Sequence, residues 1–133
     1  MSLRMVQFLL EDCMPIALIA DDSMFQRMVL AKIAKSEGFD VLEAKNGQEC
    51  LDILRANKPD ITLLDINMPV LSGMEVLDAV QAEGLASCIV VISADIQETT
   101  RQRCLGYGVR AMLNKPPQED VLREHLRGVL AGS

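Results

Sequence analysis

Polar side chains stand at or just beyond the ends of short apolar runs in this sequence of 133 residues. They are Asp21, Asp22, Asp65, Ser93 and Lys115. If the apolar runs are parallel strands of one sheet, their carboxyl ends share one edge, and these side chains converge there. Two like charges about 4 Å apart repel by roughly 4 kcal/mol at an effective dielectric of 20, so three carboxylates need a counter-charge. Lys115 offsets one charge, and a divalent cation can offset the rest.

A site of this composition can perform phosphoryl transfer, which depends mainly on positioning and charge neutralisation. Asp65 is the expected nucleophile because it ends the central apolar run, and a carboxylate that attacks a phosphoryl group forms an aspartyl-phosphate. Mg²⁺ suits a site with a few carboxylates, waters and phosphate oxygens. The expected ligands of Mg²⁺ are Asp21, Asp22, Asp65 and the main-chain carbonyl of Asn67, and the expected phosphate-binding side chains are Ser93 and Lys115.

Each of these residues also has a purely structural interpretation. Asp21 and Asp22 can cap the helix that follows them. Asp65 can open an Asx turn, Ser93 can cap a helix, and Lys115 can be a solvated surface side chain. Taken one at a time these alternatives are reasonable, but the order and spacing of all five residues favour a functional site.

The elements that position these residues follow from the apolar patterns. The predicted strands are 16–20, 40–44, 61–64, 88–92 and 109–113, and the predicted helices are 24–35, 47–58, 72–83, 96–105 and 118–130. Strands that are apolar without alternation are typical of a parallel sheet covered on both faces. The mixed runs 40–44 and 109–113 indicate partial exposure or an edge position. Five β-α units in succession predict an α/β fold with one doubly wound parallel sheet and helices on both faces.

Composition excludes several classes of protein. The net charge of −6 argues against direct nucleic-acid binding, which usually needs a basic face. No run of 18 apolar residues is present, so no membrane span is expected, and the first residues lack the features of a signal peptide. Four cysteines without a CxxC pair and a single histidine argue against a zinc site and favour reduced thiols in a cytoplasmic protein. Residues 1–14 lie outside the β-α pattern and are expected to be an extension, native or appended, before a domain at 15–133.

Four segments resemble the receiver domain of two-component response regulators: IALIADDS, LLDINMPVLSGMEVL, VVISA and LNKP. The resemblance covers about residues 15–131, and these motifs in this order are jointly specific. It implies the flavodoxin-like fold of the chemotaxis regulator, with strand order 2-1-3-4-5. Its implied site comprises the acidic pair Asp21 and Asp22, the phosphoacceptor Asp65, the carbonyl of Asn67, the switch hydroxyl of Ser93, the phosphate-binding Lys115, Pro116 after a cis peptide, and Pro69 and Gly73 in the loop after the acceptor.

One position departs from the family pattern. Three residues before the lysine, the family usually has an aromatic side chain that rotates inward on phosphorylation, and here this residue is Met112. A thioether can fill the same space without a ring or hydroxyl. The departure puts the usual coupling of hydroxyl and ring in doubt, and leaves phosphorylation itself unaffected.

The resemblance also implies partners. A histidine kinase or phosphotransfer protein would donate the phosphoryl group, and an effector would bind the face formed by about residues 95–131. Phosphorylation would favour one of two pre-existing states of the domain, and the effector would bind that state. A phosphorylation-dependent homodimer is compatible with this behaviour. The chain is expected to be a signalling domain rather than an enzyme. Two alternatives are a phosphatase-like enzyme, for which Asn67 stands where a second acid is needed, and a pseudo-receiver that binds partners without phosphorylation.

Overall fold

The computed structural model describes residues 14–85, 87–94 and 96–132. Strands and helices alternate along the chain, as the sequence predicts. The strands are β1 (Ile16–Ala20), β2 (Asp40–Ala44), β3 (Ile61–Leu64), β4 (Ile89–Ser93) and β5 (Ala111–Asn114). The helices are α2 (Met24–Ser36), α3 (Gly47–Asn57), α4 (Gly73–Glu83), α5 (Glu98–Gly106) and α6 (Glu119–Leu130). The expected extension lies outside the described residues except for Met14.

All five strands form one parallel sheet in the order β2-β1-β3-β4-β5, which confirms the implied topology. Every residue of β3 and β4 is buried, as expected for apolar strands without alternation. The two mixed runs, β2 and β5, are the edges of the sheet. The order reverses between β1 and β3, so the carboxyl ends of these two central strands open onto the crevice where ligands of doubly wound sheets bind.

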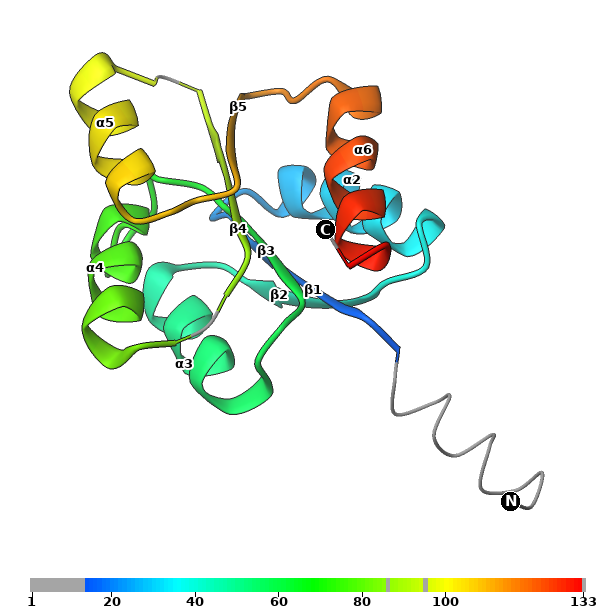
Figure 1. The fold of residues 1–133 in the computed structure, drawn as a ribbon, viewed down its shortest axis with the longest axis horizontal. Coiled ribbons are helices and arrows are strands. Elements are labelled where there is room, and N and C mark those ends of the chain that lie inside the picture. Colours follow the sequence, from blue (N-terminus) through cyan, green and yellow to red (C-terminus); the bar gives the residue numbers. More distant parts are fainter. Residues whose placement is uncertain (1–13, 86, 95, 133) are drawn as a thin grey trace.

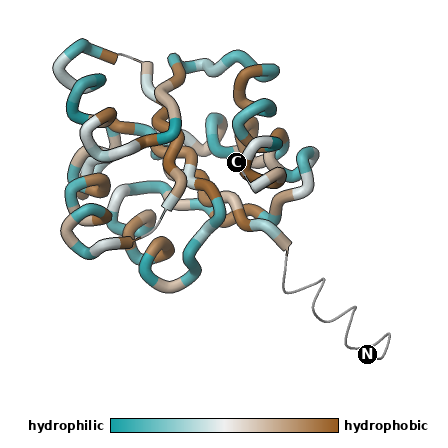
Figure 2. The backbone as a smooth tube through the Cα atoms, viewed as in Figure 1, coloured by the Kyte–Doolittle hydropathy of each residue, from teal (hydrophilic) through white to brown (hydrophobic). Residues whose placement is uncertain are grey.

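The helices cover both faces of the sheet. Helices α2 and α6 lie on one face, and α3, α4 and α5 lie on the other (Figure 1). The buried side chains form two apolar clusters, one on each face. Hydrophobic residues follow the central strands, whereas the outer turns of the helices are mostly hydrophilic (Figure 2). The sheet is therefore packed against helices on both faces, and its carboxyl edge carries the loops.

Helix ends explain where the sequence-based boundaries shift. Ser23, Asn46 and Ser72 cap α2, α3 and α4 with side-chain hydrogen bonds. Strand β5 begins at Ala111 rather than at 109 because the Val109 N–H completes the end of α5 by donating to the Cys104 carbonyl at 3.5 Å, next to Gly108 at φ +76°. This is the pattern of a helix that ends at a glycine. The sequence suggests a strand at Val109 because this residue is apolar.

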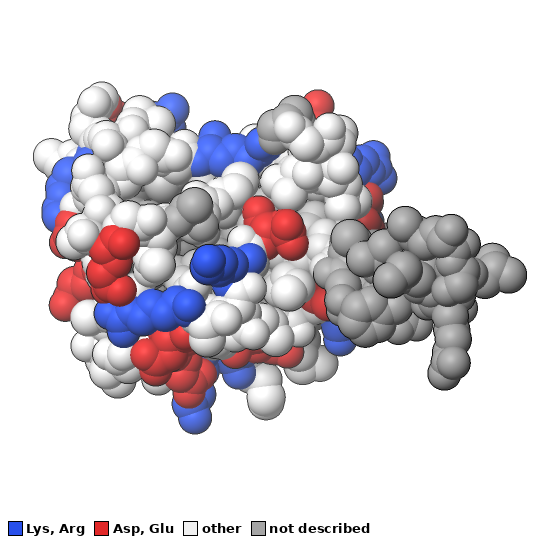
Figure 3. All heavy atoms as spheres, turned by 60° about the horizontal axis from the view of Figure 1, so that its bottom comes forward, with Lys and Arg blue, Asp and Glu red and all other residues white. Residues whose placement is uncertain are grey.

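The surface of the described residues carries both signs of charge. Acidic and basic side chains are interspersed on the face shown in Figure 3, in keeping with a modest net charge of −6. None of the helices in the described ranges is both long enough and apolar enough to cross a membrane.

Candidate functional site

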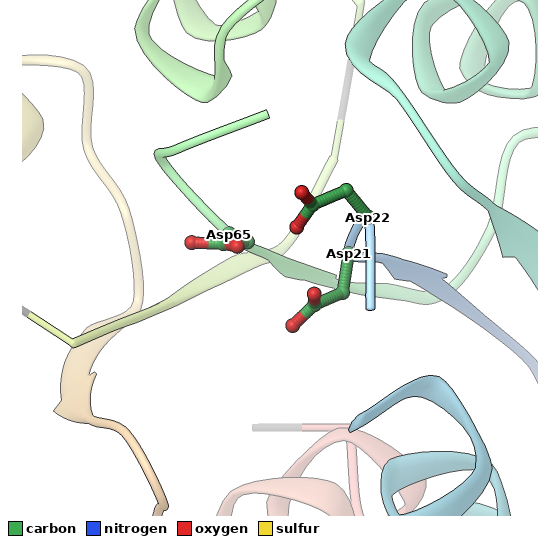
Figure 4. Close-up of side chains that lie close together, drawn as sticks. All are labelled: Asp21, Asp22 and Asp65. Atoms are coloured by element: carbon green, nitrogen blue, oxygen red, sulfur yellow. The ribbon is translucent and has the colours of Figure 1, made fainter. Parts of the chain in front are cut away.

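Three aspartates meet at the carboxyl ends of β1 and β3. Asp21 and Asp22 directly follow β1, and Asp65 directly follows β3, which is the neighbour of β1 in the sheet (Figure 4). Each offers one carboxylate oxygen, and these oxygens all lie within 4.8 Å of one another. Asp21 and Asp65 are only 2% and 5% exposed, whereas Asp22 is exposed. The predicted convergence of the three carboxylates is thus observed.

Lys115 reaches into this cluster from the end of β5. Its Nζ donates to Asp21 Oδ2 at 2.6 Å and to Asp65 Oδ2 at 3.1 Å, and its side chain is 15% exposed. The peptide between Lys115 and Pro116 is cis, as the resemblance implied. The interpretation of Lys115 as a solvated surface residue is therefore wrong. Three carboxylates and one ammonium give the cluster a formal charge of −2, which one divalent cation would neutralise.

Burial and pairing shift the protonation of two of these groups. Burial raises the pKa of Asp65 above its usual value, and the hydrogen bond from Lys115 opposes this only in part. Burial also acts on Lys115 and disfavours its ammonium, but the hydrogen bonds and charges of Asp21 and Asp65 outweigh it, and the pKa of Lys115 is raised. Lys115 is thus held in its charged form beside a carboxylate that is partly desolvated.

The loops hold the carboxylates through short backbone contacts. Asp21 Oδ1 accepts a hydrogen bond from Ser23 N at 2.9 Å, and Asp65 Oδ1 accepts one from Asn67 N at 3.2 Å. The cap of α2 is Ser23, whose Oγ accepts from Gln26 N at 3.3 Å, so neither aspartate is the N-cap. Asp65 does make an Asx turn, and this turn orients one of its oxygens while the other faces Lys115. The carbonyl of Asn67 as a metal ligand remains a prediction.

Ser93 is the last residue of β4 and is 1% exposed. Its Oγ is buried and has no hydrogen-bond partner among the described residues. It does not cap the next helix, because α5 begins after Gln97. A buried hydroxyl without a partner is costly, and its position at the carboxyl edge of the sheet leaves it available to a ligand oxygen.

Gly73 sets the distance between the acceptor loop and α4. A Cβ at this position would overlap the Asp65 carbonyl oxygen and come within 2.7 Å of Ile66 Cα. The Gly73 N–H also donates to the Ile66 carbonyl at 2.8 Å. The first turn of α4 therefore packs directly against the backbone that carries Asp65, a contact that only glycine permits.

The donor set fits Mg²⁺. Oxygen atoms of three carboxylates lie close together, two of the three side chains are buried, and Asp22 is exposed, so water or a phosphate can complete the coordination. The four predicted metal-binding and acceptor residues with acidic or basic side chains, Asp21, Asp22, Asp65 and Lys115, are all brought together.

Sequence reasoning missed one member of this region. Arg27, on the first turn of α2, donates from Nη1 to the main-chain carbonyl of Asp21 at 2.7 Å. Its Nε donates to Glu43 on β2 at 3.2 Å. The sequence offers no signal for this contact, since an arginine one turn after a helix cap most often points to solvent.

Comparison with known proteins agrees with this geometry. Residues 17–127 match the family model of the response regulator receiver domain. The chain is 34% identical over 117 residues to the protein PilH of Pseudomonas aeruginosa, covering 86% of this chain and 97% of PilH. It is 34% identical over 109 residues to the sensor histidine kinase RcsC of Salmonella typhimurium, covering 82% of this chain but only 12% of that kinase.

A solved structure shares the fold. The chemotaxis response regulator CheY4 of Vibrio cholerae superposes with a TM-score of 0.79 at 26% sequence identity, over 88% of this chain and 99% of that one. The sequence and structure comparisons therefore match nearly the whole of the described domain.

Proposed function

The chain belongs to the response regulator receiver domain family, and from that premise we propose that Asp65 accepts a phosphoryl group. As a receiver domain of two-component systems it is a signalling domain rather than a conventional enzyme. The observation that carries the proposal is Lys115 Nζ, which lies 3.1 Å from Asp65 Oδ2 at the carboxyl edge of the sheet. An ammonium there can hold an oxygen of the transferred phosphoryl group beside the carboxylate that receives it.

The proposed reaction forms one bond and breaks one. An Asp65 carboxylate oxygen attacks phosphorus and forms the O–P bond as the P–N bond of a phosphohistidine breaks, leaving the histidine on the donor. Lys115 holds one phosphoryl oxygen, and the unpartnered hydroxyl of Ser93 donates to another. Burial raises the pKa of Asp65, and the hydrogen bond from the Lys115 ammonium opposes this shift by favouring the ionised carboxylate that attacks.

Asp21, Asp22, Asp65 and the Asn67 carbonyl are the proposed Mg²⁺ ligands. When bound, Mg²⁺ would supply charge neutralisation for the phosphoryl oxygens. The residues themselves orient the acceptor: Lys115 bridges Asp21 and Asp65, and the Asx turn at Asp65 fixes the oxygen that faces away from Lys115.

Phosphorylation of the purified chain tests the proposal. With Mg²⁺ and acetyl phosphate, we expect intact-mass spectrometry to show the gain of one phosphoryl group, and Asp65→Asn to abolish it. Asp52→Asn, at an exposed aspartate of α3, removes the same charge and should leave the gain unchanged. A gain of mass that persists in Asp65→Asn would overturn the assignment.

The phosphatase-like alternative makes a different prediction. Such an enzyme needs an acid two residues after the nucleophile, and the Asn67 amide cannot act as a general acid. Steady hydrolysis of a phosphomonoester such as p-nitrophenyl phosphate would favour that alternative. A pseudo-receiver would gain no phosphoryl group at all, which the complete set of acidic, hydroxyl and lysine side chains argues against.

The phosphodonor is proposed to be a histidine kinase or phosphotransfer protein that docks on the start of α2. Met24, Phe25 and Met28 are 67%, 70% and 61% exposed, and they lie in the first turns of the helix that begins two residues after Asp22. Exposed apolar side chains grouped beside a reactive site are typical of a protein-binding surface. This surface would bring a phosphohistidine close to Asp65.

Phe25→Ala tests the docking surface. The phosphodonor is the histidine kinase of the same organism that phosphorylates the unsubstituted chain fastest. We expect Phe25→Ala to slow this transfer about tenfold or more, because an aromatic side chain at the centre of an interface contributes much of its binding energy. Phosphorylation by acetyl phosphate should stay unchanged, because this small donor needs no surface. Leu105→Ala, at a residue of α5 that is 50% exposed, is the matched control and should affect neither reaction.

The effector is proposed to bind α5, β5 and α6. Helix α5 buries only Cys104, so it can shift at little cost. A surface groove lies along β5 and the start of α6, lined by residues that include Met112 and Val121. A phosphorylation-dependent homodimer through the same face is part of this proposal, as is a cytoplasmic location. Met112, partly buried against the core, replaces the usual aromatic side chain in the proposed switch.

A further inference from the structure

The loop with the acidic pair is held in part by Arg27, a residue outside the proposed site. Residues 21–23 leave the sheet at the end of β1, and the Asp21 N–H donates to the Ala44 carbonyl on β2 at 3.0 Å. On the other side of the same residue, Arg27 Nη1 donates to the Asp21 carbonyl at 2.7 Å. The peptide group between Asp21 and Asp22 is therefore fixed by a side chain from α2.

Arg27 is itself fixed. Its Nε donates to Glu43 Oε1 at 3.2 Å, and its side chain is only 14% exposed. A guanidinium has planar, rigid donors, so one arm held by Glu43 directs the other arm at the Asp21 carbonyl. Helix α2, the loop and β2 are in this way joined through a single, half-buried guanidinium.

Asp22 depends on this contact most. Asp21 has Ser23 N and Lys115 Nζ to orient its carboxylate, whereas the Asp22 side chain makes no hydrogen bond or ion pair with the described part of the chain. Within the described ranges, its direction is set by the backbone that carries it. The carbonyl that Arg27 holds belongs to the peptide bond immediately before Asp22, and this peptide's orientation sets where the Asp22 carboxylate points.

We propose that Arg27, oriented by Glu43, is a positioning residue that preorganises Asp21 and Asp22 for a divalent cation and so sets the affinity for Mg²⁺. The inference rests on the proposed function. Arg27 would contact neither the metal nor the phosphoryl group. Residues that orient metal ligands from outside the coordination sphere typically contribute about 10- to 100-fold to metal affinity.

The charge of Arg27 and its positioning role predict opposite changes in Mg²⁺ affinity when Arg27 is replaced, which makes the inference testable. Arg27 carries a positive charge near an acidic site, so by Coulomb's law alone its removal would strengthen Mg²⁺ binding. If Arg27 acts by positioning, Arg27→Ala weakens Mg²⁺ binding despite the more negative site. Isothermal titration with MgCl₂ at constant ionic strength measures the dissociation constant directly.

The expected result is a dissociation constant raised about tenfold in Arg27→Ala. Arg27→Lys keeps the charge and the apolar stem but can hold only one partner at a time. Its dissociation constant for Mg²⁺ should therefore fall between those of the unsubstituted chain and Arg27→Ala. Arg55→Ala is the matched control, because Arg55 likewise donates two hydrogen bonds between two elements, to Glu83 at 2.8 and 2.6 Å, and joins α3 to α4. It should leave the dissociation constant within about twofold of the unsubstituted chain.

A second readout separates affinity from chemistry. In phosphorylation by acetyl phosphate, Arg27→Ala should shift the half-saturating Mg²⁺ concentration about tenfold and leave the rate at saturating Mg²⁺ unchanged. Unchanged or tighter Mg²⁺ binding by Arg27→Ala and Arg27→Lys would overturn this inference and leave the proposed function standing. No Mg²⁺ binding by the unsubstituted chain would overturn the proposed metal site, and this inference with it.

Discussion

At the scale of single residues, the Ser93 hydroxyl is buried without a hydrogen bond to the described residues, and Lys115 bridges two carboxylates. An unsatisfied buried hydroxyl costs a folded protein about 1–3 kcal/mol. The three aspartates repel one another as well, and a single ammonium compensates them only in part. In the proposed function, a cation and a phosphoryl group would each supply the partner that one of these groups lacks.

Ser93→Ala should therefore affect stability and function in opposite directions. We expect the free energy of unfolding, from urea titration, to stay equal or to rise by up to about 1 kcal/mol, since an unpaired hydroxyl is removed. The rate of phosphorylation by acetyl phosphate should fall about 10- to 100-fold, the value of one hydrogen bond to a charged group. Ser93→Thr keeps the hydroxyl and should retain most of the rate. If Ser93→Ala kept the full rate, Ser93 would have no part in phosphoryl transfer.

The residue types of the site were predictable, but not all of their contacts. Asp65, Lys115 and the acidic pair could be assigned because polar residues at the ends of apolar strands must meet at one edge of a parallel sheet. That Lys115 pairs with Asp21 at 2.6 Å as well as with Asp65 was not predictable, because it depends on side-chain conformations. Arg27 was missed for the same reason, since its partners come from a loop and from an edge strand.

At the scale of elements, the acceptor loop owes its position to the close packing of α4. Gly73 opens that helix, and its N–H bonds to the loop that follows Asp65. The capping box of Ser72 and Glu75 fixes where the helix begins. A sequence-based boundary at residue 72 was nearly right for this reason. The contact of Gly73 with the Asp65 backbone lies across the chain and could not be read from the capping pattern.

Gly73→Ala should move the acceptor. The added methyl group would overlap the Asp65 carbonyl and lie 2.7 Å from Ile66 Cα, and both are backbone atoms that cannot rotate away. We expect a loss of about 1–3 kcal/mol in the free energy of unfolding and a slower phosphorylation by acetyl phosphate. Gly106→Ala, at the end of α5 with no atom within 4 Å of the added group, should be neutral or stabilising by up to about 1 kcal/mol. Equal effects of the two substitutions on phosphorylation would show that the contact with Asp65 is unimportant.

At the scale of the whole molecule, the two chain-distant helices on one face of the sheet are tied together by charge. Glu37, just after α2, accepts hydrogen bonds from Arg127 Nε and Nη2 at 2.9 Å and from Arg123 Nη1 at 2.8 Å, both on α6. The fold class, with helices on both faces of the sheet, followed from five alternating β-α units. The ion-pair network did not, because helices adjacent in space lie about 90 residues apart in sequence. The tie fixes the first and last helices of the domain relative to the sheet that carries the site.

This tie between α2 and α6 makes the stability of the fold depend on pH. The hydrogen bonds from Arg127 and Arg123 lower the pKa of Glu37 from 4.5 to about 2. A lowered pKa means that the folded state binds the proton less well than the unfolded state, so the contribution of Glu37 is complete above pH 4.5 and is lost as the pH falls toward 2. We expect Glu37→Gln to be less stable than the unsubstituted chain at pH 7, with the difference in urea midpoint shrinking between pH 4.5 and pH 2. Glu124→Gln, which removes the same charge at an exposed position of α6, should show no such pH-dependent difference. A difference between Glu37→Gln and the unsubstituted chain that stays constant from pH 7 to pH 2 would mean that the ionised carboxylate of Glu37 does not stabilise the fold.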